Sequence, residues 1–398
     1  MKDALYNLLH DATRLTRSGS VIEATRVIQR ALLASRATPS VVEVPAEAVA
    51  PGESDGRRSS TRVTASEAES ALVIDGCVFE VDLPDEVAVP QPESAHVPET
   101  EPEVVGTGQF LGGTHTQRAL ARAYKLYIPP GSAGRVLPLV VMLHGCTQNP
   151  DDFAVGTGMN ERARAQGFYV LYPAQAQEAN PSRCWNWFKH NHQRREGGEA
   201  ALIEGMCQAV MQQYGIDSQR VYIAGLSAGG AMAAIVGGLF PETFAAVGVH
   251  SGLPAGSATD LVGALKVMKS GSAASTTAAT QAVPTIVFHG DQDRTVHPSN
   301  GDHLIAAVQE HLVGTAPATA SGADSRQVEQ AVTAGGRRYT RTSYRDSRDT
   351  VVAEHWLVHG AGHAWAGGNA AGSYTDASGP DASGEMLRFF FGQSRPAN

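Results

Sequence analysis

The stretch VYIAGLSAGGAM, residues 221–232, joins an apolar run to a serine that is flanked on both sides by glycine. The apolar residues before Gly225 predict a buried strand, and the small residues after Gly229 predict a helix. A strand that turns into a helix through Gly-x-Ser-x-Gly is a nucleophile elbow, in which the serine backbone is strained and bulkier neighbours would collide. The pattern therefore predicts Ser227 as a nucleophile at a helix N-terminus, where the helix dipole favours negative charge.

A serine hydroxyl is a weak nucleophile on its own, so it needs a base and an acid that orients the base. Two later segments, each following a predicted strand, supply candidates. The first segment offers Asp291 and Asp293 as the acid, and the second offers His359 and His363 as the base. The order serine, aspartate, histidine is the one that this class of sheet uses.

The oxyanion of a tetrahedral intermediate needs two N–H donors, which in this arrangement come from the backbone. The first donor is predicted to be the amide of Ala228, which directly follows the serine. The second should come from the loop HGCTQNPDD, which follows the predicted strand at residues 137–145. We predict the amide of Cys146 as this donor, with Thr147 as the alternative.

Predicted strands alternate with predicted helices over residues 107–398, which is typical of an α/β fold with a mostly parallel sheet and helices on both faces. Residues 1–35 carry apolar stripes at helical spacing and predict a helical hairpin. Residues 36–106 are rich in Pro, Glu and Ser and predict a largely disordered linker. Two Ala/Ser/Thr-rich insertions, at residues 254–283 and 313–335, interrupt the later units and are expected to shape the substrate pocket.

Composition argues against several classes of protein. The 398 residues carry a formal net charge of -9 without a long basic run, whereas nucleic-acid binding needs clustered cations. No transmembrane segment and no signal-peptide pattern is predicted, so a cytoplasmic location is expected. No metal site is expected, because none of the cysteines forms a CxxC pair. The cysteines are Cys77, Cys146, Cys184 and Cys207.

Five motifs follow one another in the chain: LHGCTQNPDDFA, CWNWF, VYIAGLSAGGAM, HGDQDRTV and GAGHAWAGG. In this order they resemble the esterase family of poly(3-hydroxybutyrate) depolymerases, which also takes in feruloyl and acetylxylan esterases. The resemblance spans residues 107–395 and implies an α/β-hydrolase fold that hydrolyses esters without a cofactor. Carried over by motif, Ser227 is the nucleophile, Asp293 the acid and His363 the base.

The resemblance also implies a substrate wall built from Trp185, Trp187 and Trp365. The loop after the histidine usually reads WPGG in this family, and Ala366 stands in place of that proline here. Because proline fixes the backbone, its loss predicts a less rigid loop around Trp365.

Cys146 and Cys184 belong to motifs that both approach the predicted site. A cytoplasmic protein would keep them as free thiols, whereas the resemblance to extracellular enzymes allows a disulfide. The residues by themselves leave both outcomes open.

The expected function is hydrolysis of a hydroxyalkanoate polyester or its oligomers through an acyl-enzyme on Ser227. The alternative is a feruloyl or acetylxylan-type carbohydrate esterase, against which the expected cytoplasmic location argues. A non-catalytic interaction protein on a hydrolase scaffold is a third class, which the intact triad disfavours. Contact with a polymer granule and self-association both stay open as roles for the hairpin of residues 1–35.

Overall fold

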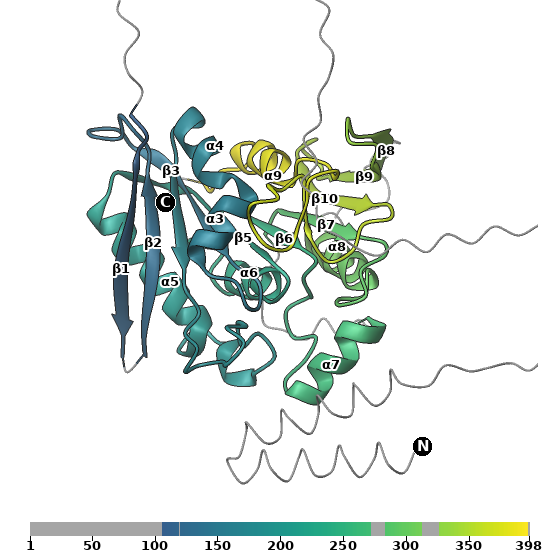
Figure 1. The fold of residues 1–398 in the computed structure, drawn as a ribbon, viewed down its shortest axis with the longest axis horizontal. Coiled ribbons are helices and arrows are strands. Elements are labelled where there is room, and N and C mark those ends of the chain that lie inside the picture. Colours follow the sequence, from purple (N-terminus) through teal and green to yellow (C-terminus); the bar gives the residue numbers. More distant parts are fainter. Residues whose placement is uncertain (1–105, 119, 272–282, 313–325, 397–398) are drawn as a thin grey trace, which may run out of the picture. The chain divides into compact units, whose positions relative to one another are not determined.

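A computed structural model describes residues 106–118, 120–271, 283–312 and 326–396. The predicted hairpin and nearly all of the predicted linker lie outside the described residues, as do parts of both insertions. The described residues build a ten-stranded sheet with helices on both faces (Figure 1). This architecture confirms the α/β fold that the sequence predicts.

The strands of the large sheet follow the order β1-β2-β4-β3-β5-β6-β7-β10-β9-β8. Pairs from β4 to β10 are parallel, whereas the pairs at both ends of the sheet are antiparallel. A separate parallel pair is formed by β11 and β12. The bounds are β1 (Gln109–Gln117), β2 (Leu120–Ile128), β3 (Leu137–Leu143), β4 (Tyr169–Pro173), β5 (Ile216–Leu226), β6 (Ala246–His250), β7 (Thr285–Gly290), β8 (Arg326–Val332), β9 (Arg338–Arg345), β10 (Val351–Val358), β11 (Trp365–Ala366) and β12 (Thr375–Asp376).

Four of the central strands are buried along their whole length. Every residue of β3, β4, β6 and β7 is buried, as expected for parallel strands that are covered on both faces. The outer strands β1, β8 and β9 were not predicted from the sequence. Their sequences QFLGGTHTQ, RQVEQAV and RYTRTSYR are polar, and β1 contains two glycines, so pairing with a neighbouring strand stabilises them more than local propensity does.

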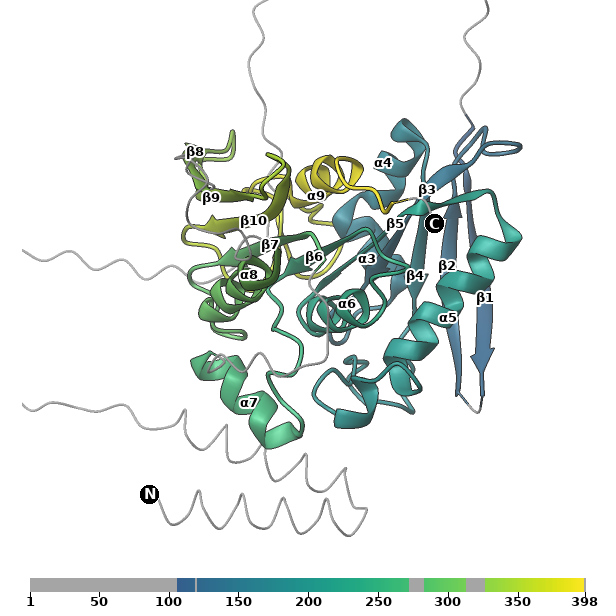
Figure 2. The same cartoon turned by 180° about the vertical axis from the view of Figure 1, so that it is seen from behind.

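The helices form two layers (Figures 1 and 2). One face of the sheet is covered by α3 (Pro150–Thr157), α4 (Met159–Gln166) and α9 (Ala382–Phe391). The other face is covered by α5 (Gly198–Gln213), α6 (Ala228–Leu239) and α8 (Ser299–Leu312). Each layer seals its own cluster of buried apolar side chains against the sheet. In the part of the chain that the structure describes, no helix combines the length and the apolar character needed to cross a membrane.

Two short helices lie in the connections. The 3₁₀-helix η1 (His190–His192) precedes α5, and α7 (Leu261–Ser270) lies within the first insertion. Asp260 caps α7 by accepting a hydrogen bond from the amide of Gly263 at 2.8 Å.

The candidate site lies where the parallel strands end. Ser227 follows β5, Asp293 follows β7, His363 follows β10 and Cys146 follows β3. Because the carboxyl ends of parallel strands meet at one edge of the sheet, segments far apart in the sequence converge there.

Candidate active site

The turn at Ser227 has the strained geometry that the sequence predicts. Its φ and ψ are 58° and -118°, a region that residues other than glycine rarely adopt. The Ser227 amide donates to the carbonyl of His250 at 2.8 Å, which ties the elbow to the end of β6. Such strain persists only where the surroundings hold it in place, and it places the hydroxyl at the start of α6.

Glycine is required on both sides of the serine. A Cβ atom at Gly225 would lie 2.4 Å from the carbonyl carbon of Gly229. A Cβ atom at Gly229 would lie 2.1 Å from the carbonyl oxygen of Leu143, the last residue of β3. Both distances are far below van der Waals contact, so the backbone of α6 can approach the sheet only without these side chains.

Buried Asp293 and partly exposed His363 form an acid–base pair. His363 Nδ1 lies 2.6 Å from Asp293 Oδ2, and Asp293 Oδ1 accepts from the amides of Thr295 at 2.8 Å and Val296 at 2.9 Å. Burial by itself would raise the pKa of Asp293, but hydrogen bonds from His289 and His363 and the amide of Val296 hold it well below the ordinary value. Asp293 is therefore ionised and fixes the proton of His363 on Nδ1.

Ser227 Oγ and His363 Nε2 are not hydrogen-bonded to each other in the described structure. None of the hydrogen bonds among the described residues uses His363 Nε2, so this nitrogen is available to a nucleophile or a substrate. Such bonds are often long without substrate and tighten when it binds.

Asp291 and His359 form a second, separate pair. His359 Nδ1 lies 3.0 Å from Asp291 Oδ2, and the amide of Gly360 donates to Asp291 Oδ1 at 2.7 Å. His359 Nε2 lies 2.8 Å from Thr340 Oγ1 on β9. Both ring nitrogens of His359 are thus occupied, as expected for a histidine that bonds locally rather than for a base.

The backbone amides of the loop after β3 point to Cys146 as an oxyanion donor. The amide of Gly145 donates to Gln148 Oε1 at 2.9 Å, and the amide of Thr147 donates to the carbonyl of Ser182 at 2.7 Å. The Cys146 amide between them has no partner among the described residues. Ala228, the first residue of α6, likewise has no intrahelical acceptor for its amide. The alternative donor, Thr147, is already engaged.

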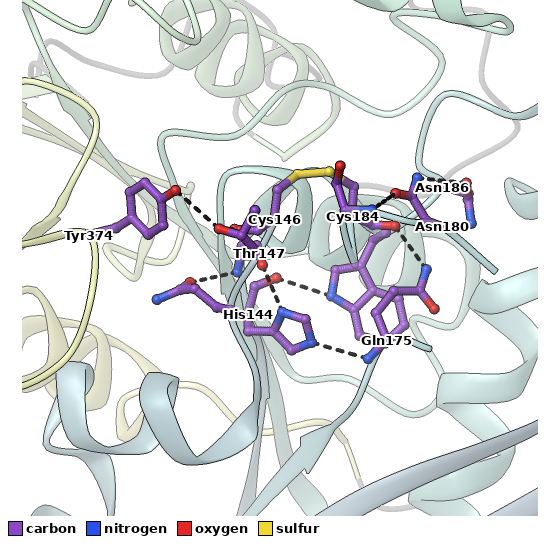
Figure 3. The surroundings of a disulfide bond; sticks show 12 residues. His144, Cys146, Thr147, Gln175, Asn180, Cys184, Asn186 and Tyr374 are labelled. Carbon is purple, nitrogen blue, oxygen red and sulfur yellow. Dashed lines mark hydrogen bonds between the residues drawn. A yellow bond between two sulfur atoms is a disulfide. The ribbon is translucent and has the colours of Figure 1, made fainter. Parts of the chain in front are cut away.

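A disulfide anchors this loop. Cys146 and Cys184 are bonded, with their Cα atoms 4.2 Å apart (Figure 3). On the other side, Thr147 Oγ1 lies 3.1 Å from the hydroxyl of Tyr374, which Figure 3 shows turned toward the loop. The loop that carries the Cys146 amide is thus tied to two distant segments of the chain. Of the two predicted outcomes for these cysteines, the structure contains the bond.

Hydrogen bonds between buried polar groups hold the segment that carries Cys184. His144 Nε2 accepts from the amide of Gln175 at 3.1 Å, and burial lowers the pKa of His144 to about 4, so the ring stays neutral. The fully buried carboxylate of Glu199 accepts from the Gln175 side chain at 2.6 Å and from the Asn186 amide at 2.7 Å. Gln175 in turn donates to the carbonyl of Cys184 at 2.9 Å. These contacts fix the segment on which Cys184 lies.

The predicted substrate wall of tryptophans requires correction. Trp185, Trp187 and Trp365 are 0%, 4% and 1% exposed, so no face of these rings is open to a substrate. Trp185 donates from Nε1 to the carbonyl of His144 at 3.1 Å, and Trp365 donates to Ser383 Oγ at 3.0 Å. The rings pack in the protein interior, because burying a large aromatic side chain with its N–H paired stabilises the fold more than exposure does.

Sequence reasoning missed several residues at the site. His250 contacts both the serine and the loop after His363, and its position at the end of a predicted strand was the available signal. The Gln148 side chain accepts a hydrogen bond from the Gly145 amide, and its place in the HGCTQ motif could have indicated that role. Tyr374, directly before β12, contacts Thr147 in the loop after β3, and no feature of the sequence points to it.

The site has the groups for acyl transfer. It combines a strained serine, an imidazole oriented by an ionised carboxylate, and two backbone amides at the same edge of the sheet. Among the described residues, no cluster of three or more His, Cys, Asp or Glu side chains is arranged to hold a metal ion.

Three similarities relate this chain to known proteins. The family profile described as Esterase PHB depolymerase matches residues 122–330, more than half of the chain. Poly(3-hydroxyalkanoate) depolymerase C of Paucimonas lemoignei is 29% identical over 250 residues, which cover 60% of this chain and 57% of that protein. Poly(3-hydroxybutyrate) depolymerase of Ralstonia pickettii is 30% identical over 253 residues, which cover 60% of this chain and 51% of that protein. The matched region thus spans little more than half the length of either relative.

The fold has a counterpart among solved structures. The acetyl xylan esterase from Aspergillus awamori superposes with a TM-score of 0.55 at 19% sequence identity, covering 71% of this chain and 99% of that chain. At this identity the likeness shows the fold alone, which is that of the α/β-hydrolases. The family profile, the elbow and the order of the motifs lead to one conclusion: the chain belongs to the esterase family of poly(3-hydroxybutyrate) depolymerases.

Proposed function

We propose that this protein is a serine esterase that hydrolyses hydroxyalkanoate polyester or its oligomers through an acyl-enzyme on Ser227. The observation that carries the proposal is the Asp293–His363 pair. The second imidazole nitrogen of this pair has no hydrogen bond among the described residues, and a strained serine lies at the same sheet edge. In this proposal Ser227, Asp293 and His363 are the triad, and the amides of Cys146 and Ala228 form the oxyanion hole.

The first half-reaction forms the acyl-enzyme. Ser227 Oγ attacks the ester carbonyl carbon while His363 Nε2 takes the hydroxyl proton. Ionised Asp293 stabilises the imidazolium, and the two amides donate to the oxyanion. When the tetrahedral intermediate collapses, the ester C–O bond breaks and His363 returns the proton to the departing alkoxide, which leaves as an alcohol.

The second half-reaction frees the enzyme. His363 takes a proton from water, and the resulting hydroxide attacks the acyl carbon on Ser227. Collapse of this second intermediate breaks the bond to Ser227 Oγ, which regains its proton from His363. The products are one carboxylic acid and one alcohol for each ester bond, and the step needs no cofactor.

The polyester substrate is supported by the two depolymerases, whose names state their substrates and which match this chain over 250 and 253 residues. The test is hydrolysis of 3-hydroxybutyrate oligomers, amorphous polymer, methyl ferulate and acetylated xylan by wild type and Ser227→Ala. We expect release from the hydroxybutyrate substrates alone and a loss of at least about 1,000-fold in Ser227→Ala. Undiminished hydrolysis by Ser227→Ala would refute the mechanism, and activity on ferulate or xylan alone would refute the substrate.

The Cys146–Cys184 bond supports an oxidising compartment, because disulfides persist there and are rare in the cytosol. The cytoplasmic location stays a prediction. Counting thiols in denatured, unreduced protein from its native source separates the two: reaction of Cys77 and Cys207 alone supports the oxidising compartment, and reaction of all four cysteines supports the cytoplasm. A role for residues 1–35 in granule contact or self-association also stays a prediction, since these residues lie outside the described part of the chain.

A further inference from the structure

His250 lies between the two halves of the proposed triad. It is the last residue of β6, where it pairs with Leu226 of β5 on one side and with Phe288 of β7 on the other. Leu226 directly precedes Ser227, whose amide donates to the His250 carbonyl at 2.8 Å. The backbone of His250 therefore holds the nucleophile elbow.

The ring of His250 reaches the loop that carries the base. Its Nε2 accepts from the amide of Ala366 at 2.9 Å, three residues after His363. Because a backbone amide can only donate, Nε2 carries no proton, and the ring proton lies on Nδ1, 3.2 Å from Ser251 Oγ. The ring is 1% exposed and stacks between Trp365 at 5.1 Å and Phe288 at 5.8 Å.

The Ala366 amide has no alternative acceptor in the small sheet. The amides on either side of it donate to the opposite strand segment, Trp365 to the carbonyl of Tyr374 at 2.7 Å and Gly367 to that of Asp376 at 2.8 Å. Ala366 is itself buried, so without His250 its N–H would be left unpaired, which destabilises the loop.

The ring keeps its acceptor through the working range of an esterase. Burial lowers the pKa of His250 to about 3; its neighbours His289 and His363 act in the same direction, and Asp293 opposes the shift. The His250 imidazole is therefore neutral at neutral pH.

We propose that His250 is a positioning residue for ester hydrolysis, because its carbonyl fixes Ser227 while its ring fixes the loop that presents His363. One residue thereby sets the spacing between nucleophile and base. This inference rests on the proposed function. It also explains how the loop after His363 is held although Ala366 stands where the resembling sequences have proline: the Ala366 amide bonds to His250, which a proline nitrogen cannot do.

The first test compares His250→Phe with His250→Gln. Phenylalanine keeps the stacked ring and the backbone carbonyl but cannot accept from Ala366, whereas the glutamine side-chain oxygen can. We expect kcat on a soluble hydroxybutyrate oligomer to fall roughly tenfold or more in His250→Phe with KM nearly unchanged, since misplacement affects the reacting geometry rather than binding. Glutamine should restore most of the loss. Equal kcat in wild type and His250→Phe would overturn the inference.

The second test removes the same hydrogen bond from its other end. Ala366→Pro deletes the donor without touching His250, so the double variant completes a mutant cycle. If the ring acts through Ala366, His250→Phe should cost less than about twofold in the Ala366→Pro background, because the bond is already absent. The same loss in both backgrounds would show that His250 acts through other contacts and would overturn the inference.

Tyr222→Phe is the matched control, and Ser227→Ala separates the inference from the function it rests on. Tyr222 is a fully buried ring on β5 that donates to the carbonyl of Gln393 at 2.8 Å, so its variant also loses one hydrogen bond, partly buried, to the backbone. We expect its kcat to match wild type. Activity that survives Ser227→Ala refutes the proposed function, whereas activity that needs Ser227 but ignores both His250 variants refutes only the inference. Active-site titration with a phosphonate corrects each rate for the folded fraction.

Discussion

Two Asp–His pairs lie on the same two loops, yet their surroundings differ. The side chains of Asp293 and His363 are 0% and 13% exposed, whereas those of Asp291 and His359 are both 30% exposed. The carboxylate of Asp293 binds two backbone amides besides the imidazole, and the second nitrogen of its histidine has no hydrogen bond within the described part of the chain. The second nitrogen of His359 is taken by Thr340. An Asp–His contact alone therefore does not indicate a base: burial and an unoccupied nitrogen distinguish the two pairs.

Replacing each aspartate by asparagine tests the difference between the two pairs most directly. We expect Asp293→Asn to lower kcat on a hydroxybutyrate oligomer by about 10³- to 10⁴-fold, because asparagine cannot stabilise the imidazolium or fix its tautomer. Asp291→Asn should retain kcat within about threefold of wild type, since its pair lies outside the proposed triad. Circular dichroism confirms that both variants are folded. A collapse of activity in Asp291→Asn instead would reverse the assignment of the two pairs.

We expect an effect of intermediate size on the free energy of unfolding of the same variants, measured as a function of pH. Burial by itself would raise the pKa of Asp293 and of Asp291, but the hydrogen bonds that each carboxylate accepts lower it at both. A folded-state pKa below the unfolded value of about 4 means that the ionised group stabilises the fold above this pH and that the contribution is lost as the pH falls further. The free energy of unfolding lost in Asp293→Asn, measured with urea, should therefore be larger at pH 7 than at pH 3. The more exposed Asp291 should show a smaller difference, and a constant loss at both pH values for Asp293→Asn would contradict the expectation.

The smallest effect concerns the nitrogen that Thr340 occupies. Thr340→Val replaces the hydroxyl by a methyl group and releases His359 Nε2. We expect the free energy of unfolding to fall by about 1 kcal/mol and kcat to stay within twofold of wild type. A large change in kcat would mean that Asp291 and His359 take part in the reaction, and it would contradict their place outside the proposed triad.

The sequence predicts the parts of the fold that depend on local pattern. The continuous apolar runs of β3 and β7 and the glycines around Ser227 signal buried strands and the elbow without further information. The edge strands β1, β8 and β9 escape such reasoning, because polar strands are stabilised by their neighbours.

The candidate site divides in the same way. The sequence narrows the acid to Asp291 or Asp293 and the base to His359 or His363, because each follows a strand. It also places the tryptophans of CWNWF near the site. It cannot tell whether their rings contact a substrate or pack in the interior, because the residue type alone does not reveal burial.

By itself, the sequence determined which residue types arrive at the sheet edge and in what order, because strand pattern and turn chemistry act over a few neighbouring residues. Only the tertiary structure decided which of them meet: His363 with Asp293, 70 residues apart, Cys146 with Cys184, 38 apart, and the His250 ring with Ala366, 116 apart. These contacts depend on how helices and strands pack, because a hydrogen bond needs its atoms within a few tenths of an ångström of one distance. No local pattern in a sequence encodes that separation.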